Sequence, residues 1–485
     1  MSRQIMVTVQ WKDSKKVIRF AYQTRLPFFA CLTEELVKEG VAFSLCGGKG
    51  FCGKCRVRFL EGAPLPKPGE RRFLTAEELR QGIRLACMSM PVRDCTVEVL
   101  FAQDTTVITE FYAEKKAGAE EEAVQGQEYI LAADVGTTTI AMAKAERYTG
   151  KILSTYTCLN PQASYGSDVI ARITQAGERG AGRLQAAVGR ALKLGAKELE
   201  ECGETIYVAA NTVMSHFLAG SDAACLGRAP FQPEFLERKE FYLQGQRIVL
   251  LPGISAFVGA DITAGLLSCG LLPVRKEMRG ILFLDLGTNG EMALCSGEKL
   301  FCTSAAAGPA FEGRTGEKRG SHMVQLLAEL LREGKMDRTG LLLTEEEQIT
   351  QKEIRDLQMA KAAVRCGVEV LLKKAGMEAF EICQVYLAGG FGYYINAADA
   401  AAVGLIPEEL CDKVISVGNS SLQGAVAYAG IDGNTADLRN ARKDKGESER
   451  LTPEMLEAAL REDCVSVNLA EEEYFLEHYV ERMNF

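Results

Sequence analysis

Four cysteines near the N-terminus constrain the fold of this chain more than any other feature. Cys46, Cys52 and Cys55 lie within ten residues, and Cys87 follows after 31 intervening residues. Glycine fills much of the loop between the first three thiols. A loop around a metal centre must turn tightly and direct backbone N–H groups inward, and glycine permits the positive φ angles that this needs. The pattern therefore predicts a tetrathiolate metal site in the first hundred residues.

This spacing resembles that of the 2Fe-2S ferredoxins, in which each iron takes two thiolates. The five-residue gap between Cys46 and Cys52 is similar to that of the adrenodoxin-like members, because the plant-type gap is four residues. A structural zinc site is the alternative, but zinc sites usually pair one C-x2-C with a second C-x2-C or with two histidines. We therefore predict that Cys46, Cys52, Cys55 and Cys87 hold a 2Fe-2S cluster.

The hydrophobic pattern around the cysteines agrees with this prediction. Apolar and polar residues alternate over 5–11, and a second strand is expected over 17–22. Helical spacing over 28–39 predicts a helix that ends at Gly40, and further strands are expected at 56–60 and 96–101. Strand, strand, helix, loop and strand is the order of a β-grasp ferredoxin. We therefore predict a ferredoxin-like domain over residues 1–101.

A change of composition separates this region from the rest of the chain. Residues 113–127 consist of Ala, Glu, Lys, Gly and Gln with a single Val, so a flexible linker is expected over 102–127. A buried strand is then expected from about residue 128. With 485 residues, of which 47% are apolar, the chain is too long for one ordinary core. Residues 128–485 are therefore predicted to form a separate domain.

Charge and cysteine usage limit the partners that we expect. Residues 1–100 hold 17 Lys and Arg against 10 Asp and Glu, whereas the whole chain has a net charge of −9. Lys49, Lys54, Arg56 and Arg58 would stabilise an anionic cluster or steer docking onto an acidic surface, unless they form a plain solvated face. Sixteen cysteines without a secretory signal favour reduced thiols in a cytoplasmic protein. The sequence has no long apolar run, so no membrane partner is expected. No nucleic-acid motif is visible and the net charge is negative, so no nucleic-acid partner is expected.

Three loops in residues 128–485 have the composition of phosphate- or adenosine-binding loops. Glycine lets backbone N–H groups approach phosphate oxygens, and threonine and asparagine side chains donate further hydrogen bonds. A leading aspartate can hold Mg²⁺, usually through water, or orient the attacking water. The chain has no P-loop sequence and no G-x-G-x-x-G after a strand, which excludes those two kinds of nucleotide site. The three loops begin at Asp134, Asp285 and Leu387.

Two Asp-x-Gly-Thr loops followed by a strand that ends in Gly-Gly resemble the actin, sugar-kinase and heat-shock-chaperone ATPases. The resemblance implies an α/β fold of two ribonuclease-H-like lobes that clamp Mg-ATP. It places Asp134 and Asp285 in the first and second phosphate loops. It places Asp261 near the metal in a connecting helix, although a helix N-cap is an equal alternative for that residue. The implied nucleotide-binding residues are Gly136, Thr137, Thr138, Asn211 (facing the γ-phosphate), Gly287, Thr288, Asn289, Gly389 and Gly390.

The combination of a ferredoxin with such an ATPase resembles the reductive activators of corrinoid proteins. Residues 160–169, 306–313, 358–363 and 418–422 also look like that family. The resemblance implies an ATP-dependent one-electron reductase that returns Co(II) to Co(I), with a 2Fe-2S cluster, ATP and Mg²⁺ as cofactors. It also implies a low-potential electron donor and suggests a homodimer. Because only the linker separates the two predicted domains, we expect a short member that lacks the extra middle domain of longer relatives.

Two alternatives to this function stay open at this point. The same machine could donate electrons to another low-potential metalloenzyme. The chain could also be a redox-sensing binding protein that ATP switches. Intact Asp134 and Asp285 loops disfavour a scaffold without ATPase activity.

Overall fold

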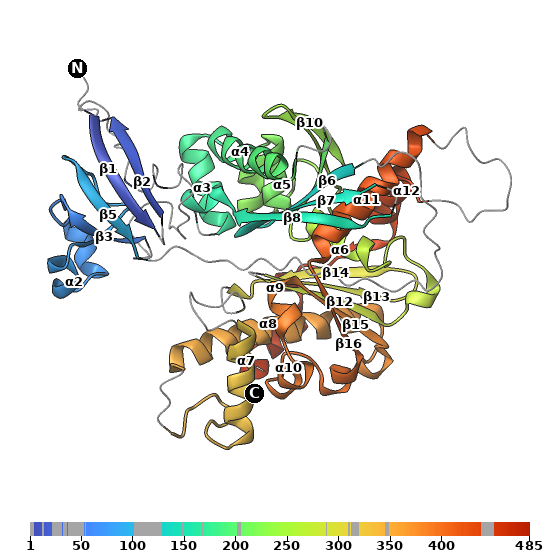
Figure 1. The fold of residues 1–485 in the computed structure, drawn as a ribbon. Helices are drawn as coiled ribbons and strands as arrows, with labels where there is room; N and C mark the ends of the chain where they lie inside the picture. The colour runs from blue at the N-terminus through green and yellow to red at the C-terminus, as the bar shows by residue number, and fades with distance from the viewer. Residues whose placement is uncertain are drawn as a thin grey trace.

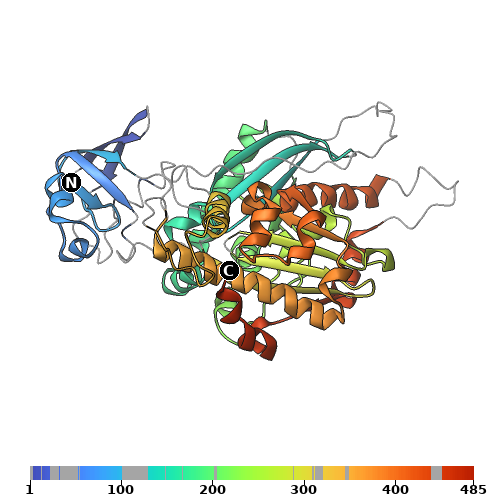
Figure 2. The ribbon, with the colours of Figure 1, turned by 90° about the horizontal axis from the view of Figure 1, so that it is seen from below.

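The computed structural model describes residues 4–11, 14–21, 32, 36, 53, 55–100, 129–147, 149–166, 168–200, 205–287, 289–308, 311, 320–344, 349–437 and 451–485. Within these ranges, no helix is long and apolar enough to cross a membrane. Figure 2 shows a small N-terminal sheet as a separate body beside two larger sheets.

The N-terminal sheet has the strand order β2-β1-β5-β3-β4. Strands β1 and β5 run parallel, and the other neighbours run antiparallel. Leu32 and Leu36 are helical and fully buried in the core of this sheet, as the spacing over 28–39 predicts; the rest of that helix lies outside the described residues. The strands are β1 (Gln4–Trp11), β2 (Ser14–Ala21), β3 (Arg56–Glu61), β4 (Ile83–Leu85) and β5 (Cys95–Val99), and helix α2 (Ala76–Arg80) precedes β4.

The first of the larger sheets has the order β10-β11-β9-β6-β7-β8. One side of this sheet is the antiparallel run β8-β7-β6, to which β9 and then β11 add in parallel. Its strands are β6 (Tyr129–Val135), β7 (Thr139–Glu146), β8 (Ile152–Leu159), β9 (Thr205–Ala210), β10 (Lys239–Leu243) and β11 (Gln246–Leu250).

The second larger sheet, with the order β16-β15-β12-β13-β14-β17, repeats this topology. Strands β14-β13-β12 run antiparallel, and β15 and then β16 add in parallel. The repeat confirms two ribonuclease-H-like lobes, and it gives Asp134 and Asp285 the same place, one residue before the end of the central strand of each lobe. The strands are β12 (Ile281–Leu286), β13 (Gly290–Cys295), β14 (Leu300–Ala305), β15 (Gln384–Ala388), β16 (Val414–Gly418) and β17 (Cys464–Ser466).

Helices cover both faces of each larger sheet because the strands are apolar on both sides (Figure 1). Helices α6 (Ala260–Ser268) and α11 (Ser420–Asp437) lie between the two sheets and share one hydrophobic core with both. The outer face of the first sheet packs on α3 (Val169–Arg179), α4 (Gly182–Glu198) and α5 (Thr212–Ala219). The outer face of the second packs on α7 (Gly320–Arg332), α8 (Gln351–Ala375), α9 (Gly389–Tyr394) and α10 (Ala397–Ala402), while α12 (Pro453–Glu462) and α13 (Glu473–His478) follow.

Helices α6 and α11 cross so closely that one position between them must be glycine. A Cβ on Gly424 of α11 would lie 1.9 Å from the carbonyl oxygen of Ala264 in α6. Because this contact is with backbone, a side chain there cannot be relieved by a rotamer change.

We expect Gly424→Ala to lower the free energy of unfolding by about 1–3 kcal/mol, the usual cost of overpacking. Gly177→Ala is the matched control, since Gly177 lies in helix α3 with nothing within 4 Å of its Cβ position. The control should raise stability by up to about 1 kcal/mol through helix propensity. Denaturant unfolding of both variants measures the difference, and equal stabilities would contradict the close crossing.

Candidate functional site

Two of the four predicted cluster cysteines meet in the N-terminal sheet. Cys55 directly precedes β3 and Cys87 follows β4, and the pairing of Arg56 with Leu85 brings the two ends together. Both thiols are buried, and the backbone N–H of Cys87 donates to Sγ of Cys55 over 3.5 Å. Hydrogen bonding from the Cys87 side chain is the main cause that lowers the pKa of Cys55. Lowering favours the thiolate, which is the form that binds iron.

The loop before Cys55 is shaped by a glycine. Gly53 has φ +65°, and a Cβ there would lie 2.9 Å from Cβ of Phe73. Cys46, Cys52, Lys49 and Lys54 lie outside the described residues.

Arg56 and Arg58 have partners within the N-terminal region, in helix α2, in loops and in strand β5. The Arg56 guanidinium pairs with Glu78 and also donates to the carbonyl oxygens of Gly53 at 3.2 Å and Phe73 at 2.9 Å. Arg58 pairs with Glu98 at 2.9 Å. Their charges are therefore partly offset locally, and Arg56 holds the loop that carries Cys55 rather than standing free to steer a partner. Cys95, which the sequence suggests is a small apolar residue, is buried in the same core, and burial raises its pKa to about 11.

The first phosphate-type loop joins β6 to β7 and is held from three directions. Its Gly136 N–H donates to the carbonyl oxygen of Thr139 at 2.9 Å, which closes the turn. The buried Asn160 amide donates to the Gly136 carbonyl at 2.7 Å, and the fully buried Arg172 donates to the Thr137 carbonyl at 2.5 Å. The loop is thus preorganised by buried groups before any ligand binds. No role in this loop could be predicted for Asn160 or Arg172, because neither is near the loop along the chain.

Asn211 also contacts this loop. It caps α5, where its Oδ1 accepts the backbone N–H of Met214 at 3.0 Å. Its Nδ2 donates to Oγ1 of Thr137 at 3.1 Å. Asn211 therefore positions Thr137, and its expected contact with the γ-phosphate stays a prediction. Thr138, also expected to bind nucleotide, is half-buried in the same loop.

The second phosphate-type loop joins β12 to β13, and its Gly287 N–H donates to the Asn289 carbonyl at 2.8 Å. Thr288 lies outside the described residues. Gly389, with φ +82°, packs directly against this loop, because a Cβ there would lie 2.5 Å from Oδ1 of Asp285 and 2.9 Å from the Leu286 carbonyl oxygen. This close approach to Asp285 is one reason for a glycine at residue 389, and the expected contact of Gly389 with a nucleotide stays a prediction. Gly390 beside it is exposed, and its contact with a nucleoside stays a prediction.

Four carboxyl groups from both lobes gather between these loops. Burial raises the pKa of Asp134 and of Asp285 to about 7, and the negative charge of Asp261 adds to both shifts. Burial likewise raises the pKa of Asp261 to about 6. Burial and the charges of Asp261 and Asp285 together raise the pKa of Glu291. Asp134 and Asp261 both accept hydrogen bonds from the start of α11, and Glu291 is paired with Asp285 in the sheet.

Asp261 does not cap its helix, so the N-cap alternative is wrong. The N-cap of α6 is Gly259, and Asp261 lies in the first turn, where its Oδ1 accepts the N–H of Ile262 at 2.9 Å. The Ser421 hydroxyl donates to the Asp261 carbonyl at 3.0 Å and so ties the start of α11 to the start of α6. The positive ends of both helix dipoles therefore lie beside the carboxyl groups, an arrangement that favours anions such as phosphate.

Asn419 is a residue of this site to which sequence reasoning gave no role. Its Nδ2 donates to Oδ2 of Asp134 at 3.1 Å, and its Oδ1 accepts the Leu422 N–H at 2.8 Å at the start of α11. The hydrogen bond lowers the pKa of Asp134 against the effect of burial. The only sequence signal was an asparagine between an apolar run and a helix, which is a common cap.

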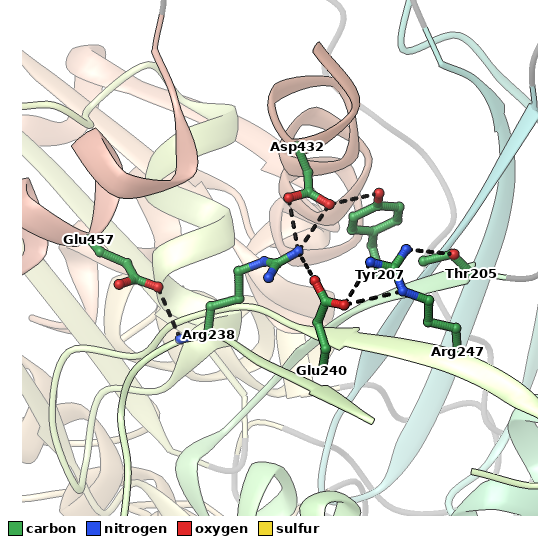
Figure 3. Close-up of polar contacts among 7 residues, drawn as sticks. All are labelled: Thr205, Tyr207, Arg238, Glu240, Arg247, Asp432 and Glu457. Carbon is green, nitrogen blue, oxygen red and sulfur yellow. Dashed lines mark hydrogen bonds and ion pairs between the residues drawn. The ribbon is translucent and has the colours of Figure 1, made fainter. Parts of the chain in front are cut away.

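A polar cluster fixes α11 to the first sheet (Figure 3). The Arg238 guanidinium donates to both carboxylate oxygens of Asp432 at 2.9 and 3.1 Å, and the Tyr207 hydroxyl donates to the same carboxylate at 3.0 Å. Asp432 lies in the later turns of α11, and Asn419 directly precedes the helix. The cluster therefore holds the helix that presents Asn419 to Asp134. Its other members are Thr205, Glu240, Arg247 and Glu457.

The carboxyl site suits a hydrated divalent cation. Carboxylate oxygens are the ligands that Mg²⁺ prefers, and Mg²⁺ usually keeps several of its waters. In the described ranges, none of the four carboxyl groups has an ion pair with lysine or arginine, so a cation would offset their mutual repulsion. The described residues contain no group of three or more His, Cys, Asp or Glu that could hold a metal ion. A cation at these carboxyl groups would have to keep most of its waters, as Mg²⁺ usually does.

The fold and the two sites define a class of protein, an iron–sulfur protein whose second part is an ATPase of two ribonuclease-H-like lobes. Family models match all three regions. A model described as a 2Fe-2S iron-sulfur cluster binding domain matches residues 31–92, the RACo middle region matches 129–273, and the C-terminal domain of RACo, the ASKHA domain, matches 279–318 and 343–485. The chain belongs to the RACo family, and it carries a 2Fe-2S cluster domain and an ATP-binding domain.

The similar proteins agree with this assignment. The corrinoid activation enzyme RamQ of Eubacterium limosum is 29% identical over 62% of this chain and 64% of its own length. A Co(II) methylated amine-specific corrinoid protein reductase of Methanosarcina barkeri is 26% identical over 38% of this chain and 44% of its own length. The chain thus matches less than two thirds of either relative. The solved structure of a reductive activator for a corrinoid, iron-sulfur protein has a TM-score of 0.62 and 24% identity over 99% of this chain and 98% of that chain, which supports the fold.

One expectation from the sequence is wrong. We expected a short member without the middle domain, but the RACo middle region matches residues 129–273. These residues include the whole first larger sheet, which we assigned to the first ATPase lobe. The middle region is therefore present, and it is the first lobe itself rather than an insertion before it. The length of the sequence alone does not show whether a segment is one lobe of a repeated fold or an inserted domain.

Proposed function

We propose that this protein is an ATP-dependent one-electron reductase that reactivates a corrinoid protein by reducing Co(II) to Co(I). The observation that carries the proposal is the presence, in one chain of the RACo family, of a 2Fe-2S domain and a two-lobed ATPase with a shared carboxyl site. The corrinoid-directed activities of the two named relatives support the same function. The cluster gives up one electron, and cobalt takes it up.

The cluster ligands in this proposal are Cys46, Cys52, Cys55 and Cys87. The meeting of Cys55 and Cys87, and the lowered pKa of Cys55, support the two described ones. We assign the ferredoxin-like domain to residues 1–101, the linker to 102–127 and the ATPase to 128–485.

The ATP site in this proposal lies between the two lobes. Asp134, Asp261 and Asp285 hold a hydrated Mg²⁺, which would neutralise phosphate charge during hydrolysis. The loops supply backbone N–H groups and hydroxyls for the phosphates, and the linked starts of α6 and α11 add favourable dipoles. The proposed nucleotide-binding residues are Gly136, Thr137, Thr138, Asn211, Gly287, Thr288, Asn289, Gly389 and Gly390.

The proposal also names the partners and the setting. A low-potential electron donor reduces the cluster, and a cobalamin-binding protein of a methyltransferase system accepts the electron. The protein works in the cytoplasm as a homodimer. Analytical ultracentrifugation checks the dimer, and a monomer at micromolar concentration would contradict that part alone.

An anaerobic reduction assay tests the function. The substrate is a purified cobalamin-binding protein of a methyltransferase system, with its cobalt in the Co(II) state. Protein reduced by Ti(III) citrate should produce the Co(I) absorption in the presence of ATP and Mg²⁺. The rate of Co(I) formation should be at least about tenfold lower with ADP or a non-hydrolysable ATP analogue, because only hydrolysis returns the two lobes to the open state.

Three outcomes would contradict the proposal in different ways. Equal rates with and without ATP would remove the ATP dependence. No Co(I) under any condition, with ATPase activity intact, would point to another low-potential metalloenzyme as acceptor. ATP-dependent binding to the corrinoid protein without cobalt reduction would favour a redox-sensing switch.

A further inference from the structure

Glu291 lies directly opposite Asp285 in the second lobe. The antiparallel register of β12 and β13 pairs these two residues, so their side chains share one face of the sheet. Ser304 of β14 is paired with Glu291 in turn, and its hydroxyl donates to Oε1 of Glu291 at 3.3 Å. The Asn289 side chain forms a second hydrogen bond with the same carboxyl group. Glu291 is half-buried, and its position is thus set by three adjacent strands.

The first lobe has no carboxyl group at the matching position. There the register of β6 and β7 pairs Asp134 with Ala141, which is buried. The two lobes share their topology and the place of the leading aspartate. The shared hairpin is therefore formed with an alanine at this position in the first lobe and with a glutamate in the second.

The environment of Glu291 makes a carboxyl group costly there. Like charges directly opposite each other destabilise a pair of strands, and Asp285 lies directly opposite Glu291. The hydrogen bonds from Ser304 and Asn289 favour the charged form, although burial opposes it. In the described part of the chain, no lysine or arginine pairs with Glu291. A bound cation would offset these negative charges.

We propose that Glu291 is a further positioning residue of the Mg-ATP site, which holds the hydrated cation together with Asp285 on the second-lobe side. This inference rests on the proposed function and goes beyond it, because it makes cation binding asymmetric between the lobes. Ser304 orients the glutamate, and Ala141 leaves the first-lobe loop with a single leading carboxyl group.

Glu291→Gln tests the inference, since it keeps the shape and the capacity for hydrogen bonds but removes the charge. Calorimetric titration measures ATP affinity with Mg²⁺ and with EDTA. The titration gives the Mg²⁺ concentration at which half of the Mg²⁺-dependent gain in ATP affinity is reached. We expect Glu291→Gln to raise this concentration about 10–100-fold, the usual effect of losing a group that orients a metal site. Affinity without Mg²⁺ should stay equal or rise. Glu298→Gln is the matched control, because Glu298 is an exposed glutamate in the next turn, between β13 and β14.

The possible failures are separable. Wild-type Mg²⁺ dependence in Glu291→Gln, beside normal Mg-ATP binding by the parent protein, would overturn the role of Glu291 and leave the proposed function standing. A parent protein that binds no Mg-ATP would overturn both. If Glu291→Gln does not fold, Ser304→Ala replaces it, and a shift of the Mg²⁺ requirement in the same direction supports the inference, while an unchanged requirement contradicts it.

Discussion

Cys55→Ser is expected to abolish the 2Fe-2S absorption and the EPR signal of the dithionite-reduced protein. Cys55 is buried beside Cys87, and its lowered pKa favours the thiolate that iron needs. A serine hydroxyl keeps the size but is a far weaker ligand, because it ionises only at very high pH. The measurement is the visible and EPR spectrum of anaerobically purified protein, together with its iron content.

Cys95→Ala is the matched control for this change. Cys95 is buried in the same core, but burial raises its pKa, as expected of a thiol that only packs. We expect the control to keep the full iron content and spectrum, with ATP turnover unchanged in both variants. A cluster that survives Cys55→Ser would contradict the assignment of Cys55 as a ligand. Loss of the cluster in Cys95→Ala would show that the spectrum reports folding rather than ligation.

Asp285→Asn is expected to reduce ATP turnover by about 10²–10³-fold, the usual size of a lost electrostatic contact in a transition state. Asp285 lies one residue before the end of the central strand of the second lobe and belongs to the four-carboxyl site. The amide keeps the size of the side chain, and with it the approach of Gly389, so the fold should stay intact. Steady-state ATPase assays at saturating Mg²⁺ measure the effect, and Asp134→Asn should behave alike because Asp134 holds the equivalent place.

Asp412→Asn serves as the control, since Asp412 is an exposed aspartate of the same lobe. The 2Fe-2S spectrum should be unchanged in all three variants because the carboxyl site and the cysteines belong to different sheets. Undiminished turnover in Asp285→Asn would place the ATP site elsewhere. Loss of the cluster spectrum in the same variant would mean that the two parts do not fold independently.

The roles of individual residues were harder to predict than the fold. Asp134 and Asp285 could be found because each leads a local Asp-x-Gly-Thr loop that a short window of sequence contains. Asn419 and Arg172 could not be found in this way. Asn419 contacts Asp134 from the start of α11, and Arg172 contacts Thr137 from α3, and both are distant from these partners along the chain. The close approach of Gly389 to the Asp285 carboxyl group could not be predicted either, since that carboxyl group belongs to another strand.

The middle region shows a different limit. Two Asp-x-Gly-Thr loops can be recognised in the sequence. Whether residues 129–273 form a lobe or an inserted domain, however, depends on the order of the strands in the sheet. Strand order is set by contacts between residues far apart in sequence, and the local hydrophobic periodicity does not reveal these contacts.

By itself the sequence determined what depends on residues close along the chain. This includes the cysteine spacing, the alternation that makes the strands of the N-terminal sheet, and the glycine and aspartate loops that end two central strands. Only the tertiary structure decided which groups meet. It set Glu291 opposite Asp285 and Asn419 against Asp134, and it showed that Asp261 faces the shared site instead of capping its helix. The physical reason is that burial and charge repulsion act through space, so a carboxyl group acquires its chemistry from neighbours that only the fold supplies.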